Sequence, residues 1–410
     1  MNIAIMGFGV VGSGVAELIE KNHANITKRS MQQSLEIKYI LDLREFPDSP
    51  FRDKIIHDFN QILNDDSVAV VVETMGGLHP AFEFVSALLQ AGKSVVTSNK
   101  ELVAAKGYEL LTIAREKNVN FLFEASVGGG IPIIRPISQC LAANEINEIA
   151  GILNGTTNFI LTKMITENME FDAALKMAQE LGYAEKDPTA DVDGFDACRK
   201  ICILASLCFG HHVYPDSVPT EGIRKISLRD VAYAADAGAV IKLLGVARKT
   251  ESDKICIFVS PCLVQKSSQL ASVDDVFNAI LVRGDAIGDV VFYGRGAGKW
   301  PTASAVVADV IDCAKHLGKR KVLDWDVPVE GEIADISEIP FAFYVRGTLP
   351  AGLNAEAAAK AVGAEKILQI PNAPANEVAL LTKKQTETAL RASLAQAGFA
   401  PDSILRVTEY

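Results

Sequence analysis

The stretch Ile3-Ala4-Ile5-Met6-Gly7-Phe8-Gly9-Val10-Val11-Gly12 decides the fold, because an apolar run leads directly into three glycines spaced as GxGxxG. Residues 3–6 have the character of a short buried strand, and a helix is expected from about residue 11 to 21. Gly7 allows a tight turn, Gly9 lets the backbone approach a pyrophosphate, and Gly12 lets the helix pack closely against the sheet. The pattern predicts a Rossmann-type dinucleotide site at Gly7, Phe8, Gly9, Val10, Val11 and Gly12.

Strands and helices alternate through the first third of the chain. Buried strands are expected at 35–41, 68–73, 94–97 and 120–123, with helices at 80–91 and 101–117 between them. Such alternation is typical of a parallel sheet covered by helices, and the polar stretch 23–34 reads as a loop. The fold class is therefore α/β, with a nucleotide-binding domain over residues 1–132.

Asp42 ends the second expected strand, where an acidic residue can accept hydrogen bonds from both ribose hydroxyls of NAD. It lies 30 positions after Gly12 (42 − 12), whereas the usual spacing is about 20, and the loop at 23–34 accounts for the excess. Arg44 follows two residues later and could hold a 2′-phosphate. Both NAD and NADP stay open as cofactors.

The remainder of the chain divides into two further parts. Amphipathic patterns at 171–181 and 231–249 predict helices, and with a strand at 255–260 they indicate an α+β catalytic domain over 133–301. A helix within about 302–318 is expected to return to the nucleotide-binding domain. The tail, 339–410, shows the order strand, helix, strand, strand, helix, strand, which predicts a ferredoxin-like module.

Composition restricts the class of protein. The chain has 410 residues, 49% hydrophobic residues and a net charge of −11, which argues against a nucleic-acid or anionic-membrane partner. No run of about 18 uncharged apolar residues is present, and the seven cysteines form neither a disulfide framework nor a familiar zinc pattern. These features predict a cytoplasmic enzyme with reduced thiols.

Charged residues are concentrated between Leu181 and Lys200, just ahead of an apolar helix. Burying such groups is costly unless they are paired, solvated or held for a ligand that carries both charges, as an amino acid does. The alternative is a solvated loop followed by a helix with an Asp196–Lys200 pair at i,i+4.

Two glycine-containing segments offer further polar groups. Asn154-Gly155-Thr156-Thr157-Asn158 could bind a substrate carboxylate or form a turn. Residues 124–131, EASVGGGI, could aim backbone carbonyls and the Glu124 carboxylate at a hard monovalent cation, or could simply connect two domains.

Ordered motifs along the chain resemble homoserine dehydrogenase. They are GFGVVGSGV at 7–15, ETMGG at 73–77, SNK at 98–100, EASVGGGIP at 124–132, NGTTN at 154–158, the charged stretch at 181–200 and GRGAG at 294–298 with PTASAV at 301–306. The resemblance implies reversible, NAD- or NADP-dependent interconversion of L-aspartate 4-semialdehyde and L-homoserine, on the way to threonine and methionine. It also implies a homodimer or homotetramer and an ACT-like tail.

The resemblance assigns roles to individual residues. It places Lys100 and Lys200 at proton transfer, and Glu185, Asp191, Asp196, Asn154, Gly155 and Thr156 at the substrate. It adds Thr74, Ser98, Lys100 and Gly296 to the cofactor contacts, and it implies a sodium ion at Glu124, Val127, Gly129 and Ile131.

Two segments depart from the family pattern. Arg295 and Lys299 add positive charge near the expected cofactor cleft, which would favour NADP, and residues 346–353 lack the acidic residue usual before proline and glycine in the first loop of the tail. The competing functions are a cofactor-sensing regulatory protein and another semialdehyde dehydrogenase. No basic patch supports the first, and Cys140 is a poor candidate for the nucleophile that the second requires.

Overall fold

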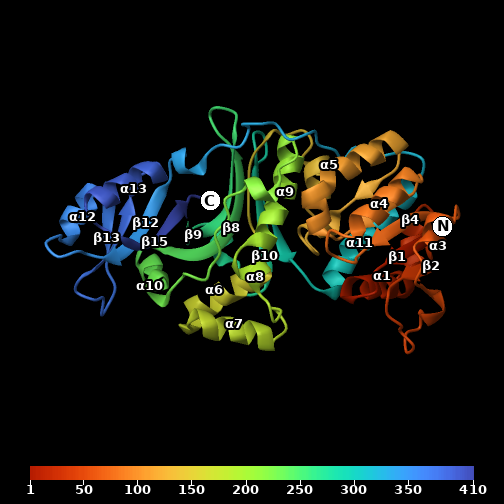
Figure 1. Cartoon of the computed structure of the whole chain (residues 1–410), viewed down its shortest axis with the longest axis horizontal. Helices are drawn as coiled ribbons and strands as arrows, with labels where there is room; N and C mark the ends of the chain where they lie inside the picture. Colours follow the sequence, from red (N-terminus) through yellow and green to blue (C-terminus); the bar gives the residue numbers. More distant parts are fainter. The chain divides into compact units, whose positions relative to one another are not determined.

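A computed structural model describes all residues from 1 to 410, and the chain forms two compact units (Figure 1). The first unit contains residues 1–145, 202–215 and 294–329, and the second contains residues 146–201, 216–293 and 330–410. The helix expected within 302–318 therefore belongs to the same unit as the nucleotide-binding residues. The C-terminal module belongs to the same unit as most of the expected catalytic domain.

The first unit contains a parallel sheet with the strand order β3-β2-β1-β4-β5-β6. Its strands are β1 (Asn2–Met6), β2 (Glu36–Leu41), β3 (Ile55–Ile56), β4 (Val68–Glu73), β5 (Ser94–Thr97) and β6 (Phe121–Leu122). Its helices are α1 (Val10–Lys21), α2 (His23–Arg29), α3 (Asn60–Leu63), α4 (Ala81–Gln90), α5 (Lys100–Lys117) and α11 (Lys299–Lys315). The order reverses between β1 and β4, and open α/β sheets bind their ligands at the carboxyl ends of the strands beside such a point. The predicted Rossmann fold is confirmed.

One local prediction in this unit is wrong. Residues 23–34 do not form a loop throughout, because α2 occupies 23–29 and buries Ile26 against the unit. The hydrophobic signal in this helix is a single residue, so sequence periodicity does not reveal it.

The second unit contains a mixed sheet with the strand order β11-β10-β7-β8-β9-β15-β12-β14-β13. The strands are β7 (Ile146–Ile152), β8 (Ala239–Lys249), β9 (Ile255–Gln265), β10 (Phe277–Gly284), β11 (Gly288–Arg295), β12 (Ala342–Thr348), β13 (Ala364–Leu368), β14 (Glu377–Thr382) and β15 (Pro401–Thr408). The helices are α6 (Gly155–Glu167), α7 (Phe171–Glu180), α8 (Thr189–Val192), α10 (Leu228–Asp236), α12 (Ala355–Ala361) and α13 (Glu387–Gln396), and α9 (Phe195–Phe209) has residues in both units.

The predicted helix at 231–249 is wrong over most of its length. Helix α10 ends at Asp236, Gly238 adopts a φ of +72°, and β8 begins at Ala239. A glycine with positive φ commonly ends a helix, and pairing with β7 and β9 then decides the conformation of the next residues.

The C-terminal βαββαβ order is confirmed, and its strands pair as β15-β12-β14-β13. The module shares the sheet of the second unit, because β15 pairs in parallel with β9 at Arg406, Val407 and Thr408. Phe258 of β9 and Phe341 beside β12 meet edge to face with ring centroids 5.6 Å apart, within a hydrophobic core that spans both parts.

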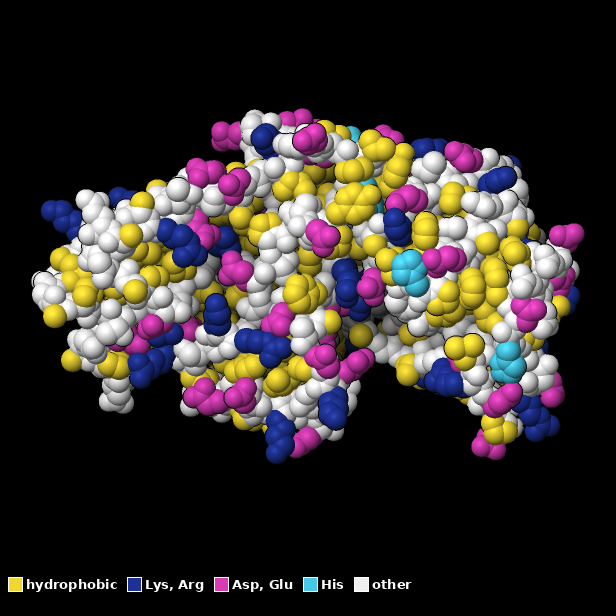
Figure 2. Space-filling view, viewed as in Figure 1, with side chains coloured by type: hydrophobic (Ala, Val, Ile, Leu, Met, Phe, Trp, Pro, Cys, Tyr) yellow, Lys and Arg dark blue, Asp and Glu magenta, His cyan; other side chains and the backbone are white.

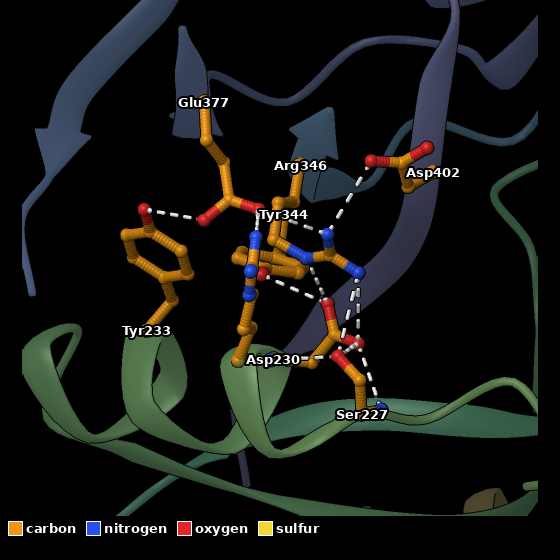
Figure 3. Close-up of polar contacts among 8 residues, drawn as sticks. Ser227, Asp230, Tyr233, Tyr344, Arg346, Glu377 and Asp402 are labelled. Carbon is orange, nitrogen blue, oxygen red and sulfur yellow. Dashed lines mark hydrogen bonds and ion pairs between the residues drawn. The ribbon is translucent and has the colours of Figure 1, made fainter. Parts of the chain in front are cut away.

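A buried group of polar residues also joins the C-terminal module to α10 (Figure 3). Arg346 Nε donates to Asp230 Oδ1 at 2.8 Å, and the Tyr344 hydroxyl donates to the same oxygen at 3.0 Å. Arg346 Nη1 lies 3.3 Å from Glu377, which accepts a hydrogen bond from the Tyr233 hydroxyl at 3.1 Å. Side chains of β12 and β14 therefore hold α10 at Asp230 and Tyr233.

The surface carries charges of both signs. Lys and Arg side chains are interspersed with Asp and Glu over the face shown in Figure 2. No helix in the structure is both long enough and apolar enough to cross a membrane.

Candidate active site

The glycine turn after β1 is shaped by close backbone contacts. Gly7 has a φ of +89°, and a Cβ there would lie 2.9 Å from Met75 N; a Cβ at Gly12 would lie 1.9 Å from the Gly7 carbonyl oxygen. A Cβ at Gly9, in contrast, would meet nothing within 4 Å. The first and third glycines are therefore required by the fold, while Gly9 leaves open space beside the turn.

The start of α1 suits an anion. Gly9 is its N-cap and provides no side-chain hydrogen bond, and the first turn contains no acidic residue. The N–H groups of a first helical turn have no partner within the helix, and the helix dipole favours negative charge there. These residues fit the pyrophosphate of a dinucleotide.

Asp42 lies at the predicted place beside this turn. Its Oδ2 accepts from the Phe8 N–H at 2.7 Å, and the Arg44 side chain donates to both carboxylate oxygens at 3.0 Å. Burial by itself would raise the pKa of Asp42, but these hydrogen bonds lower it to about 2. An ionised acceptor and an exposed guanidinium thus stand together at the end of β2, so a ribose hydroxyl and a 2′-phosphate each have a complementary group.

Two loops at the carboxyl ends of β4 and β5 are fixed to each other. Glu73 is buried and accepts from the Thr97 hydroxyl at 2.5 Å and from Met75 N at 2.8 Å, and burial raises its pKa. Asn99 donates to the Gly77 carbonyl at 2.7 Å and caps α5 through the Leu102 N–H. Sequence reasoning missed both roles, although a glutamate directly after a run of valines was a visible signal.

These loops carry the other residues expected at the cofactor. Lys100 is the first residue of α5, the Thr74 hydroxyl donates to the Gly7 carbonyl at 2.9 Å, and Ser98 N donates to the Glu73 carbonyl at 3.3 Å. Thr74 and Ser98 therefore have structural hydrogen bonds along the edge where a cofactor is expected.

The segment around Gly296 packs against the glycine-rich loop that follows β6. A Cβ at Gly129 would lie 2.2 Å from the Gly296 carbonyl oxygen. Lys299 pairs with Glu17 at 2.8 Å, about two turns from the start of α1. This ion pair balances the charge that Lys299 was expected to bring to the cofactor.

Glu124 has partners different from those expected. Its Oε1 accepts from the Ile133 N–H at 2.6 Å, and its Oε2 accepts from the Arg135 N–H at 2.9 Å. Ile131 N donates to the Gly128 carbonyl at 2.9 Å, which folds the loop tightly. An ionised carboxylate has about four acceptor positions, so these hydrogen bonds fix the direction of the Glu124 side chain within the loop.

In the second unit, Asp196 and Lys200 share one face of α9. Lys200 Nζ donates to Asp196 Oδ2 at 2.8 Å and to the Leu153 carbonyl at 2.7 Å, and both side chains are buried. The expected i,i+4 pair is present, and it is a buried pair rather than a solvated one. The Leu153 carbonyl was not foreseen, because backbone direction cannot be read from sequence.

Asn154 joins Asp196 to Asp191. Its Nδ2 donates to Asp191 Oδ1 at 2.7 Å and to Asp196 Oδ2 at 2.9 Å. Its Oδ1 accepts from the Thr157 N–H at 2.8 Å and caps α6. The structure therefore brings Asn154, Asp191, Asp196 and Lys200 together.

The remaining predicted substrate residues surround this group. Gly155 begins α6 close to the Val276 carbonyl, and the Thr156 hydroxyl donates to the Tyr183 carbonyl at 2.6 Å. Glu185 is exposed on the loop between α7 and α8, where its main-chain carbonyl accepts from Gln179 at 3.1 Å.

Comparison with known proteins identifies the family of the chain. The model of the homoserine dehydrogenase NAD-binding domain matches residues 7–124, and the homoserine dehydrogenase model matches residues 132–311. The chain is 46% identical over 319 residues to a homoserine dehydrogenase of Synechocystis sp., covering 76% of this chain and 73% of that protein. The chain belongs to the homoserine dehydrogenase family. It is thus an oxidoreductase that acts on a CH–OH group, interconverting L-homoserine and L-aspartate 4-semialdehyde with NAD(P) in threonine and methionine biosynthesis.

The fold is shared with solved homoserine dehydrogenases. The enzyme of Thiobacillus denitrificans superimposes with a TM-score of 0.89 at 34% identity, covering 100% of this chain and 98% of that chain. A hyperthermophilic archaeal homoserine dehydrogenase in complex with NADPH gives a TM-score of 0.65 at 30% identity, covering 76% of this chain and 97% of that chain. The family and the glycine turn together support a nicotinamide dinucleotide as cofactor.

Proposed function

We propose that Lys100 and Lys200 move the proton at the substrate oxygen during homoserine oxidation and aldehyde reduction. The observation that supports this role is the buried Lys200 amine, which donates to the Asp196 carboxylate and to the Leu153 carbonyl and is therefore held in one direction. Lys100 supports it from the carboxyl end of β5, where an open α/β sheet receives its ligands. When bound, the nicotinamide accepts or delivers the hydride.

The chemistry at the oxygen explains why amines are needed. Oxidation of L-homoserine removes the hydroxyl proton as the carbon loses a hydride, and the reverse reaction must protonate an alkoxide. A positioned amine can take up or donate this proton, and its charge stabilises the developing oxyanion. Asp196 holds the Lys200 nitrogen in one direction.

The carboxylates of the second unit suit the substrate ammonium. Asn154 brings the carboxylates of Asp191 and Asp196 together, and Asp196 also accepts from Lys200. An L-amino acid brings the complementary ammonium. Glu185 is proposed to add a further carboxylate, and Gly155 and Thr156 to line the same site.

The test is a rate measurement on purified protein with L-homoserine and either NAD or NADP. Lys200→Met and Lys100→Met should each lower kcat by roughly 10²–10⁴-fold, the usual contribution of general acid–base catalysis. Lys186→Met, at an exposed lysine of the same charged stretch, is the matched control and should keep its activity. Full activity in both catalytic variants would remove the assignment.

Three further properties belong to this proposal. Sodium is proposed to bind the Glu124 carboxylate and the main-chain carbonyls of Val127, Gly129 and Ile131. A homodimer or a larger homo-oligomer is supported by the family and by β11, whose outer edge has no partner strand within the chain. A cytoplasmic location is supported by seven cysteines that form no disulfide.

A further inference from the structure

The amide of Asn154 uses both of its hydrogens on carboxylates. They point to Asp191 Oδ1 at 2.7 Å and Asp196 Oδ2 at 2.9 Å, while Oδ1 faces the Thr157 N–H at 2.8 Å and the Thr157 hydroxyl at 3.0 Å. A side-chain amide has only two N–H donors. A substrate carboxylate needs donors, and Asn154 has none left to offer it.

The orientation of this amide is determined by the residues around it. Only Oδ1 can accept from the Thr157 N–H at the start of α6, so Nδ2 must face the two aspartates. Leu153, the preceding residue, receives a hydrogen bond from Lys200 at 2.7 Å. Two consecutive residues at the start of α6 therefore position both members of the Asp196–Lys200 pair.

The charges around the amide explain why a neutral donor is needed. Asp191 of α8 and Asp196 of α9 accept from the amide, and Lys200 of α9 donates to the carbonyl of the preceding residue, Leu153. Gly245 of β8 and the Val276 carbonyl, in the loop before β10, also lie beside this segment. Two carboxylates near one another repel, and a donor shared between them offsets that repulsion.

We infer that Asn154 is a positioning residue, which holds Asp191 and Asp196 in one orientation for the substrate ammonium and fixes the Asp196 carboxylate beside Lys200. The inference rests on the proposed function and refines it, because it replaces a predicted substrate contact by an indirect role.

The test compares Asn154→Asp with Asn154→Ser. Asn, Asp and Ser are similarly good N-cap residues, so α6 stays capped in both variants. Asp has the shape of Asn but, when ionised, donates no hydrogen bond, whereas Ser donates one. Since a hydrogen bond to a charged group is worth on the order of tenfold or more, kcat/KM for L-homoserine should fall about 100-fold or more in Asn154→Asp and less in Asn154→Ser.

The pH dependence separates positioning from a merely structural role. In Asn154→Asp, a protonated carboxyl could again donate one hydrogen bond, so the ratio of variant to wild-type kcat/KM should decline as the pH rises. The KM for NAD should stay unchanged, because the nucleotide residues lie in the first unit. Asn354→Asp, the same change at the N-cap of α12, is the matched control and should leave all rates unchanged.

The outcomes are distinguishable. Wild-type protein that does not oxidise L-homoserine would overturn both the proposed function and this inference. Active wild type with Asn154→Asp within about threefold of it would overturn the inference alone, and so would equal, pH-independent losses in the Asp and Ser variants. The graded, pH-dependent loss described above would support it.

Discussion

Replacing Arg346 by methionine should destabilise the second unit strongly. The guanidinium contacts Asp230 at 2.8 Å and 3.3 Å and Glu377 at 3.3 Å, and Asp230 is 0% exposed. Removing one partner of a buried ion pair leaves the other charge uncompensated, which costs about 3–5 kcal/mol. The contact with Asp402 at 3.4 Å adds little, because that carboxylate is half exposed.

Urea unfolding followed by far-ultraviolet circular dichroism measures this loss. Arg346→Met combined with Asp230→Asn should cost less than the sum of the single changes, with a coupling energy of about 2 kcal/mol. Lys384→Met is the control, because it breaks an exposed pair with Glu409 and should cost less than about 1 kcal/mol.

Acid pH gives an independent check on Asp230. Burial by itself would raise its pKa, but hydrogen bonds from Arg346 and Ser227 lower it below the usual value. A carboxylate with a lowered folded pKa stabilises the protein above its unfolded pKa, and this stabilisation is lost as the pH falls through the folded pKa. In Arg346→Met the Asp230 carboxyl loses its cation. The difference in the free energy of unfolding between wild type and variant should therefore become smaller at acid pH. A loss below about 1 kcal/mol in Arg346→Met at neutral pH, or no coupling with Asp230, would refute the reasoning.

Three other predictions concern the first unit. Gly9→Ala should leave the melting temperature unchanged but weaken NAD binding in a titration. Gly12→Ala should lower the melting temperature, because its Cβ would lie 1.9 Å from the Gly7 carbonyl oxygen. Equal melting temperatures of the two variants would contradict this prediction. Burial raises the pKa of Asp309 from 3.8 to about 7, so stability should fall as the pH rises through this interval, and a melting series of Asp309→Asn should be flatter. An unchanged series would mean that Asp309 is ionised throughout. Gly107→Ala would place a Cβ 2.5 Å from the Trp325 ring and should cost about 1–3 kcal/mol in urea unfolding, and a stabilised variant would show that the ring can shift.

The sequence was sufficient where one residue type has one purpose. Gly7 and Gly12 predicted the first turn because only glycine fits such close backbone contacts, and Asp42 followed from its place at a strand end. The wrong helix at 231–249 shows the opposite case, since strand pairing overrode a pattern that also suited a helix.

The candidate site was less predictable than the fold. Asp196 and Lys200 are four residues apart on one helix, so their contact could be foreseen. The hydrogen bond to the Leu153 carbonyl and the use of both Asn154 N–H groups on aspartates depend on how the start of α6 packs against α9. This is a tertiary contact between segments distant in the sequence. The same reason explains the hydrogen bonds from the Ile133 and Arg135 N–H groups to Glu124, which sequence reasoning did not foresee.

The pairing of β15 with β9 has a consequence for protein engineering. A shortened chain that ends before β12 would remove β15 from β9 at Cys262, Leu263 and Val264, and would expose the apolar residues of β9 that share a core with the C-terminal module. Such a deletion should cause aggregation rather than yield a shorter enzyme that stays in solution. Chimeras that exchange the tail between homologues will therefore need to carry β9 along with it.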